Sequence, residues 1–90
     1  MELSELREEI NMIDTELTAL FLRRMAVSKE IATVKAAQGL PILNAAREAA
    51  VLEKVSAAAP EDLKASVRAL YTEIMRLSRE YQKAIHPELN

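Results

Sequence analysis

One long stretch without a helix breaker constrains the fold of this chain most. From Leu3 to about Ala37 there is neither a proline nor a glycine, so no residue there interrupts a helix. Apolar residues recur in it at alternating spacings of three and four, the heptad form of helical periodicity. They are Leu3, Leu6, Ile10, Ile13, Leu17, Leu20, Val27, Ile31 and Val34. The pattern predicts one uninterrupted helix over about residues 3–38.

A second, shorter helix is predicted after a brief connector. Gly39 is the only glycine of the chain and is well placed for the left-handed position just past a helix end. Pro41 disfavours helix for the residue before it, so residues 40–43 are expected to be extended. Asn44 is a good N-cap for a helix over about residues 45–58.

A third helix follows the next proline. Pro60 ends the second helix and suits the first turn of another, which apolar spacing extends over about residues 61–85. We expect residues 86–90 to form a frayed tail. There is no β-type alternation and no internal repeat. The predicted fold class is therefore all-α, with residues 1–90 forming a single domain of one long, one short and one medium helix.

The length of the first helix predicts an assembly. A helix of about 35 residues is roughly 50 Å long, whereas a compact domain of 90 residues has a radius of gyration of about 12 Å. The two shorter helices cannot cover the apolar stripe of the first along its full length. A second copy must cover the remainder, most simply by antiparallel two-fold pairing. We expect an intertwined homodimer.

Composition and charge exclude several classes of function. The net charge is −2 with 29% charged residues, which argues against binding to nucleic acid or to an anionic membrane. The chain has no cysteine, and it shows no signal peptide and no membrane span. We expect a cytoplasmic protein. With no glycine-rich phosphate loop, no histidine pair and no nucleophile–base pair in the sequence, we expect neither a metal site nor a cofactor.

Cationic residues interrupt the apolar stripe of the first helix. Arg24 occupies a position in that stripe where an apolar residue is expected. Lys35 lies eleven residues further on, about 20° from the same face and roughly 16 Å along the axis. Ser28 and Ile31 lie between them on that stripe. Two long cationic side chains that reach toward each other from these positions could hold one small anion. Arg7 lies about 25 Å before Arg24 and about 100° round the helix, so it can serve only a site built mainly by a partner subunit.

The other two helices also carry polar residues within apolar stripes. Glu48 interrupts the inward face of the second helix, with Arg47 beside it. In the third helix Ser78 and Gln82 are four residues apart and therefore point the same way. Taken singly, each has an ordinary structural explanation: solvated helix charges, a helix edge, or an Arg24 that snorkels or pairs with Glu48.

A shared pocket explains these interruptions together. Desolvating several charges is costly unless they are paired or bind a ligand. The excess charge is cationic, so the predicted ligand is a small dianion. It should carry at least one hydroxyl from which Glu48 can accept a hydrogen bond. Without a nucleophile or a metal, any chemistry should depend on placement and electrostatics.

The ordered set of these residues resembles the all-helical class of chorismate mutases. The pattern comprises Leu6-Arg7-x-x-Ile10-x-x-x-Asp14, Arg24, Lys35, Pro41-Ile42, Arg47-Glu48 and Ser78-x-x-x-Gln82. The resemblance covers nearly the whole chain and implies an intertwined dimer of three-helix subunits with two active sites. It also implies an isomerase that converts chorismate to prephenate, a pericyclic Claisen rearrangement on the route to phenylalanine and tyrosine.

The resemblance implies which residues hold the two carboxylates of chorismate. The partner's Arg7 and Arg24 would bind them, Arg47 would add positive charge, and Ser78 would contact the side of the ring carboxylate. Each active site would then be completed by an arginine from the other subunit.

The resemblance also implies which residues meet the reacting and hydroxyl oxygens. Lys35 and Gln82 would donate to the ether oxygen, on which negative charge grows as the C–O bond stretches. Glu48 would accept from the ring hydroxyl. The chain departs from the family pattern at Asn44-Ala45, where Asp-Pro is common. Asn44 can still cap its helix and contact the hydroxyl, but it carries no charge.

Two other functions fit part of the pattern. An isochorismate pyruvate-lyase shares the fold and the cationic groups, but Glu48, placed for the hydroxyl of chorismate, favours the mutase. A non-catalytic helical module for dimerisation or regulation would keep the helices and form no prephenate. The sequence leaves open whether the domain stands alone or belongs to a fusion with another enzyme of the pathway, and whether feedback regulates it.

Overall fold

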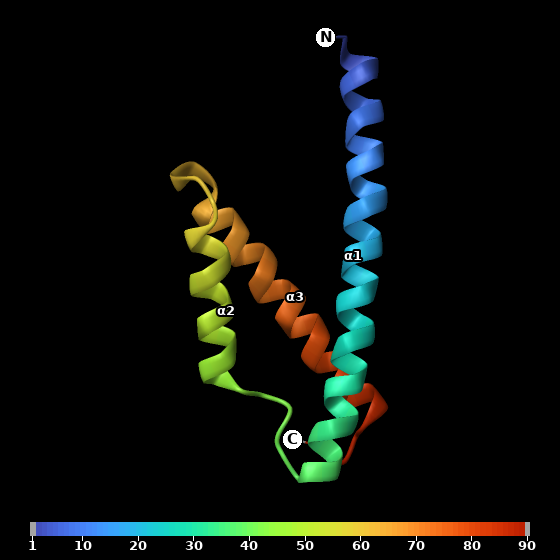
Figure 1. Ribbon diagram of the computed structural model, residues 1–90, viewed down its shortest axis with the longest axis vertical. Coiled ribbons are helices and arrows are strands. Elements are labelled where there is room, and N and C mark those ends of the chain that lie inside the picture. The colour runs from blue at the N-terminus through green and yellow to red at the C-terminus, as the bar shows by residue number, and fades with distance from the viewer. Residues whose placement is uncertain (1, 90) are drawn as a thin grey trace.

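The computed structural model describes residues 2–89, and these form an all-helical chain (Figure 1). Its elements are α1 (Leu3–Gln38), α2 (Ala45–Ala57), the short 3₁₀ turn η1 (Glu61–Leu63) and α3 (Lys64–Ile85). No strand occurs among the described residues. The prediction of an all-α fold with one long, one short and one medium helix is confirmed.

The two ends of the connector between α1 and α2 have the predicted local structure. Gly39 follows α1 with φ 67°, and the amide of Leu40 donates to the carbonyl of Lys35 at 2.9 Å, which satisfies carbonyls at the helix end. At the start of α2, Oδ1 of Asn44 accepts from the backbone N–H of Arg47 at 3.0 Å. Asn44 is therefore the N-cap.

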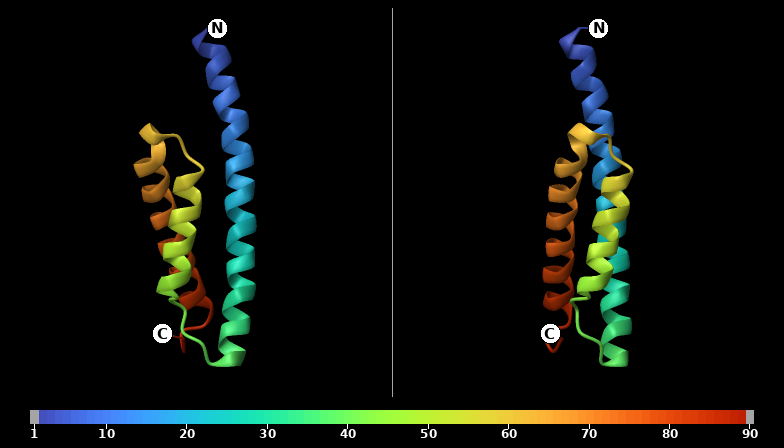
Figure 2. Two further views of the ribbon diagram at one scale, coloured as in Figure 1. Left: turned by 60° about the vertical axis from the view of Figure 1, so that its left-hand side comes forward. Right: turned by 90° about the vertical axis from the view of Figure 1, so that its left-hand side faces the viewer.

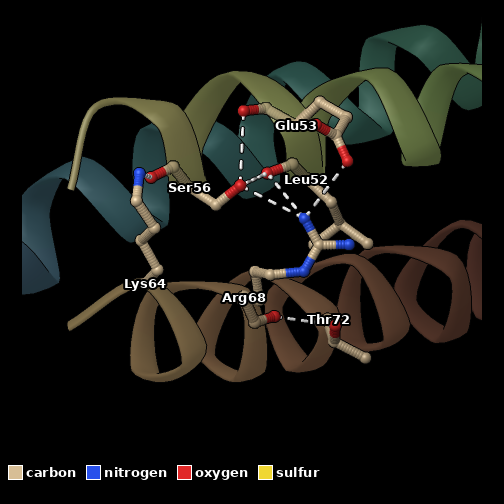
Figure 3. Close-up of polar contacts among 6 residues, drawn as sticks. All are labelled: Leu52, Glu53, Ser56, Lys64, Arg68 and Thr72. Atoms are coloured by element: carbon tan, nitrogen blue, oxygen red, sulfur yellow. Dashed lines mark hydrogen bonds and ion pairs between the residues drawn. The ribbon is translucent and has the colours of Figure 1, made fainter. Parts of the chain in front are cut away.

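A cluster of hydrogen bonds joins the end of α2 to the start of α3 (Figure 3). Nζ of Lys64 donates to the carbonyl of Ser56 at 2.9 Å, and Nη1 of Arg68 donates to Oγ of Ser56 at 3.1 Å. Between the helices, Pro60 leads into the 3₁₀ turn η1. The predicted third helix therefore starts with a 3₁₀ turn, a common form of a helix N-terminus.

The segment after α3 packs against the helices, so the expected fraying is wrong for residues 86–89. Leu89 is buried, and its amide donates to the carbonyl of His86 at 3.0 Å. Nε2 of His86 lies 3.4 Å from Oγ1 of Thr33 in α1. A hydrogen bond from its own backbone and one from His86 hold the pKa of Glu88 below its ordinary value. The apolar side chain of Leu89 thus anchors the tail.

Helix α3 packs against both other helices, whereas α1 and α2 do not pack against each other. The chain runs down α1, back along α2 and down again along α3 (Figures 1 and 2). In the view of Figure 1, α3 lies behind the other two helices and runs diagonally from the side of α2 to that of α1. The N-terminal turns of α1 project beyond the turn between α2 and α3 (Figure 2). The start of α1 is therefore a projecting arm.

The apolar stripe of α1 is not covered by its own chain. Its nine aliphatic members are between 42% and 61% exposed: Leu3, Leu6, Ile10, Ile13, Leu17, Leu20, Val27, Ile31 and Val34. The radius of gyration is 16.2 Å, against about 12 Å for a compact domain of this length. An exposed apolar surface of this extent is typical of an interface.

None of the helices within residues 2–89 combines the length and the apolar character needed to cross a membrane.

Candidate functional site

A cavity of about 360 Å³ lies where the three helices and the connector converge. Seven of the eight predicted site residues line it, together with apolar side chains such as Val27, Ile31, Val51 and Met75. The seven are Arg24, Lys35, Asn44, Arg47, Glu48, Ser78 and Gln82. The structure thus brings together residues that are up to 58 positions apart in the chain.

Arg7 is the predicted site residue that the structure places elsewhere. It lies on the second turn of α1, is exposed, and does not line the cavity of its own chain. The rise of a helix puts it about 25 Å from Arg24. Arg7 can therefore reach a cavity of this kind only in another copy of the chain.

Arg24 lies on the wall of the cavity, at the point where the stripe of α1 meets α3. Its Cζ is 5.8 Å from the centroid of the Tyr71 ring, a distance suited to a cation–π interaction. The ion pair of Glu48 in the described chain is with Arg79, not with Arg24. The structural alternative of an Arg24–Glu48 pair is therefore not what forms.

Lys35 joins the end of α1 to the connector. Its Nζ donates to the carbonyl of Ile42 at 2.5 Å, and its side chain is only partly exposed. Ile42 is itself buried at 5% exposure. An ammonium group has three N–H donors, so this bond fixes the position of the charge and leaves two donors for a ligand in the cavity.

Glu48 is held by a cation that was not among the predicted site residues. Nη1 of Arg79 donates to both carboxylate oxygens of Glu48, at 2.5 and 2.6 Å. The two side chains are 33% and 26% exposed, so the pair is partly desolvated. Each carboxylate oxygen can accept more than one hydrogen bond, and Glu48 can therefore still accept from a ligand hydroxyl.

The sequence does indicate that Arg79 could reach the cavity, although Arg79 does not itself interrupt an apolar stripe. Arg79 follows Met75 by four residues and precedes Gln82 by three. Both spacings put side chains on the same side of a helix. Because arginine is long, it reaches the cavity from the edge of that face.

Three buried polar side chains form a chain of hydrogen bonds between α1 and α3. Oγ of Ser28 lies 2.7 Å from Oγ of Ser78, and Nε2 of Gln82 donates to Oγ of Ser78 at 3.2 Å. Their exposed fractions are 5%, 6% and 6%. Oε1 of Gln82 is buried without a hydrogen-bond partner. Ser28 was recognised as a member of the stripe but was not predicted as a site residue.

The charge of the cavity suits an anion. Four cationic side chains and one carboxylate line it. The ion pair between Arg79 and Glu48 is balanced, so the net charge comes from Arg24, Lys35 and Arg47. Much of the remaining wall is aliphatic, from side chains such as Val27, Ile31 and Val51. The site can therefore hold a small dianion that also has an apolar part, and it can present N–H donors to that ligand.

Several known proteins are similar in sequence to this chain. An intracellular chorismate mutase of Mycobacterium tuberculosis is 42% identical over 60 residues, which are 67% of this chain and 57% of the relative. The protein of the same name from Mycobacterium bovis matches equally. The T-protein of Haemophilus influenzae is 41% identical over 51 residues, 57% of this chain and 14% of that protein. No solved structure gives a significant match.

The family comparison covers more of the chain. The matched segment spans a little over half the length of the mycobacterial relatives. The profile of the chorismate mutase type II family, in contrast, matches residues 6–83. That range includes α2, nearly all of α1 and α3, and every residue that lines the cavity. The chain belongs to the chorismate mutase type II family.

Proposed function

We propose that this chain is an isomerase that rearranges chorismate to prephenate. The observation that carries the proposal is the cavity, where Arg24, Lys35 and Arg47 supply a net positive charge beside donors and an aliphatic wall. Chorismate is a dianion with a ring hydroxyl, which matches this lining. The mycobacterial relatives are named as chorismate mutases, which supports the same reaction.

The rearrangement needs a bound conformation and stabilisation of charge. The enolpyruvyl side chain must lie over the ring, and a cavity that holds both carboxylates restricts the substrate to such conformers. As the C–O bond breaks, negative charge develops on the ether oxygen. Lys35 and Gln82 are the proposed donors to that oxygen, and they stabilise the transition state more than the ground state. No proton transfer is required.

The carboxylates are assigned to the arginines. Arg24 binds one carboxylate, Arg47 adds positive charge, and Ser78 lies beside the ring carboxylate without donating a hydrogen bond to it. The second arginine is the partner's Arg7. This assignment requires a homodimer, and support for it comes from the uncovered stripe of α1 and from the distance of about 25 Å between Arg7 and Arg24 in one helix.

The ring hydroxyl is assigned to Glu48, with Asn44 as a second contact. Arg79 keeps both oxygens of Glu48 in place, and each keeps the capacity to accept one more hydrogen bond. Oδ1 of Asn44 already accepts from the backbone of Arg47, so its contact with the hydroxyl comes from the Nδ2 donor. Because an ionised carboxylate can accept hydrogen bonds but not donate them, Glu48 favours substrates that carry a hydroxyl at this position.

We also propose that residues 1–90 form one chorismate-mutase domain and that the protein acts in the cytoplasm. The family match over residues 6–83 supports the first proposal. The word "intracellular" in the names of the mycobacterial relatives supports the second.

The test is to incubate the purified protein separately with chorismate and with isochorismate and to identify the products. We expect prephenate from chorismate, at a rate well above the uncatalysed rearrangement. Pyruvate and salicylate from isochorismate, without prephenate from chorismate, would instead make the protein a lyase. A helical dimer that consumes neither compound would be a non-catalytic module.

A further inference from the structure

The hydroxyl of Ser28 makes a different hydrogen bond from those of four other Ser and Thr residues on these helices. Thr15, Thr33, Ser56 and Thr72 each donate to the carbonyl four residues earlier, the usual arrangement for Ser and Thr within a helix. Ser28 in α1 and Ser78 in α3 are instead bonded to each other across the helix contact at 2.7 Å. Both are buried, and both line the cavity.

The third member of the chain has an unsatisfied group. Gln82 donates through Nε2 to Ser78, while its Oε1 is buried without a partner. A buried polar atom without a hydrogen bond is unfavourable. A half-turn of the carboxamide about its terminal bond exchanges the two atoms. Oε1 then accepts from the hydroxyl of Ser78, and the N–H groups point where Oε1 points in this structure.

The direction of the hydrogen bonds decides which arrangement forms. A serine hydroxyl has one proton to donate and can accept two hydrogen bonds. If Ser78 donates to Gln82, its oxygen can only accept from Ser28. The order is then Ser28 to Ser78 to Oε1 of Gln82, and both N–H groups of Gln82 are left for a ligand.

We propose that Ser28 is a positioning residue: by donating to Ser78 it turns the carboxamide of Gln82 so that its N–H groups face the bound substrate. The inference rests on the proposed function, because the atom that receives the N–H is the ether oxygen of chorismate. Without Ser28, Ser78 donates to the carbonyl of Ile74, one turn earlier in its own helix. Gln82 then donates one N–H group to Ser78, which holds the carboxamide in the other orientation and leaves at most one N–H group for the substrate.

The kinetic test compares Ser28→Ala with Ser28→Thr, which keeps the hydroxyl. Ser28→Ala should lower kcat by about threefold to tenfold, the range for one neutral hydrogen bond, and change KM by less than about twofold. Ser28→Thr should retain most of kcat. Ser56→Ala is the matched control, because Ser56 is equally buried but lies outside the cavity, and it should keep the wild-type kcat.

A double-mutant cycle with Gln82→Ala separates positioning from a general structural effect. In the Gln82→Ala background, Ser28→Ala should cause no further loss of kcat, because the group that Ser28 orients is already absent. An equal loss in both backgrounds overturns the proposal. So does a Ser28→Ala variant that raises KM and leaves kcat unchanged.

A spectroscopic readout keeps this inference distinguishable from the proposed function. The side-chain amide signals of Gln82 in a ¹⁵N–¹H spectrum are assigned by their loss in Gln82→Ala. Ser28→Ala should move them, and Ser28→Thr should leave them near their wild-type positions. If wild type forms no prephenate, the proposed function fails while this comparison still decides the role of Ser28. Unmoved signals in Ser28→Ala refute the positioning role.

Discussion

Replacing Lys35 probes the donor that should contribute most to the rearrangement. Lys35→Ala removes an ammonium group that is already fixed at 2.5 Å from the carbonyl of Ile42 on the cavity wall. Loss of one preorganised donor to a developing oxyanion lowers kcat by about 10²–10³-fold. We expect a loss of that size for prephenate formation, measured with chorismate at saturation.

The effect on stability is much smaller and can be measured separately. The hydrogen bond to Ile42 joins a charged donor to a backbone carbonyl, and the side chain of Lys35 is partly exposed. Loss of this hydrogen bond should lower the free energy of unfolding by about 1.5 kcal/mol. A domain with at least about 5 kcal/mol of stability stays more than about 99% folded after that loss. Partial unfolding therefore cannot account for a 10²-fold drop in kcat. Urea denaturation of both proteins gives the comparison.

Two further variants isolate the ammonium group. Lys35→Met keeps the length of the side chain and should lose as much kcat as Lys35→Ala. Lys29→Ala removes a cation from the same helix outside the cavity and should change kcat by less than about twofold. A folded Lys35→Met protein that retains kcat within threefold of wild type would refute the assignment of Lys35 as the main donor.

Three other changes test separate features. Leu17→Lys puts a charge in the apolar stripe of α1 and should weaken dimerisation by at least about 100-fold in sedimentation, whereas Thr18→Lys, beside the stripe, should not. Arg79→Met releases Glu48 and should raise KM for chorismate by about threefold to tenfold, while an unchanged KM would exclude this role. Gly39→Ala should lower the free energy of unfolding by about 1 kcal/mol in urea denaturation, because the φ of 67° is strained for alanine. A Cβ atom at this position would meet no other atom within 4 Å, so no steric clash adds to that cost. A cost near zero would contradict this reasoning.

Local signals in the sequence predicted the helices well, because each boundary depends on nearby residues. Gly39 has the positive φ that ends α1, and Asn44 caps α2. The stretch without proline or glycine corresponds to the 36 residues of α1. The tail was misjudged, since its short polar sequence gives little sign that Leu89 packs against the helices.

The composition of the cavity was predicted from polar residues that interrupt apolar stripes, but the pairing of their charges was not. Spacing shows that Glu48 faces inward, yet it cannot choose between Arg24 and Arg79 as the partner. That choice depends on how α2 and α3 cross, a property of tertiary packing. The bond between Ser28 and Ser78 was missed for the same reason: it joins residues on different helices.

The central claim is that each long helix serves two active sites, through Lys35 in one and Arg7 in the other. Mixing two inactive variants tests it. Arg7→Ala and Lys35→Ala are unfolded together in equal amounts and refolded, so that half of the dimers contain one chain of each kind. In such a dimer one site lacks both residues, and the other has the partner's Arg7 and its own Lys35.

The measurement is the rate of prephenate formation by the refolded mixture, compared with each variant refolded alone. Because half of the dimers carry one intact site of two, the account predicts about one quarter of the wild-type rate. If Arg7 serves the site of its own chain, every site in the mixture lacks either Arg7 or Lys35. A mixture no more active than the separate variants would contradict the account.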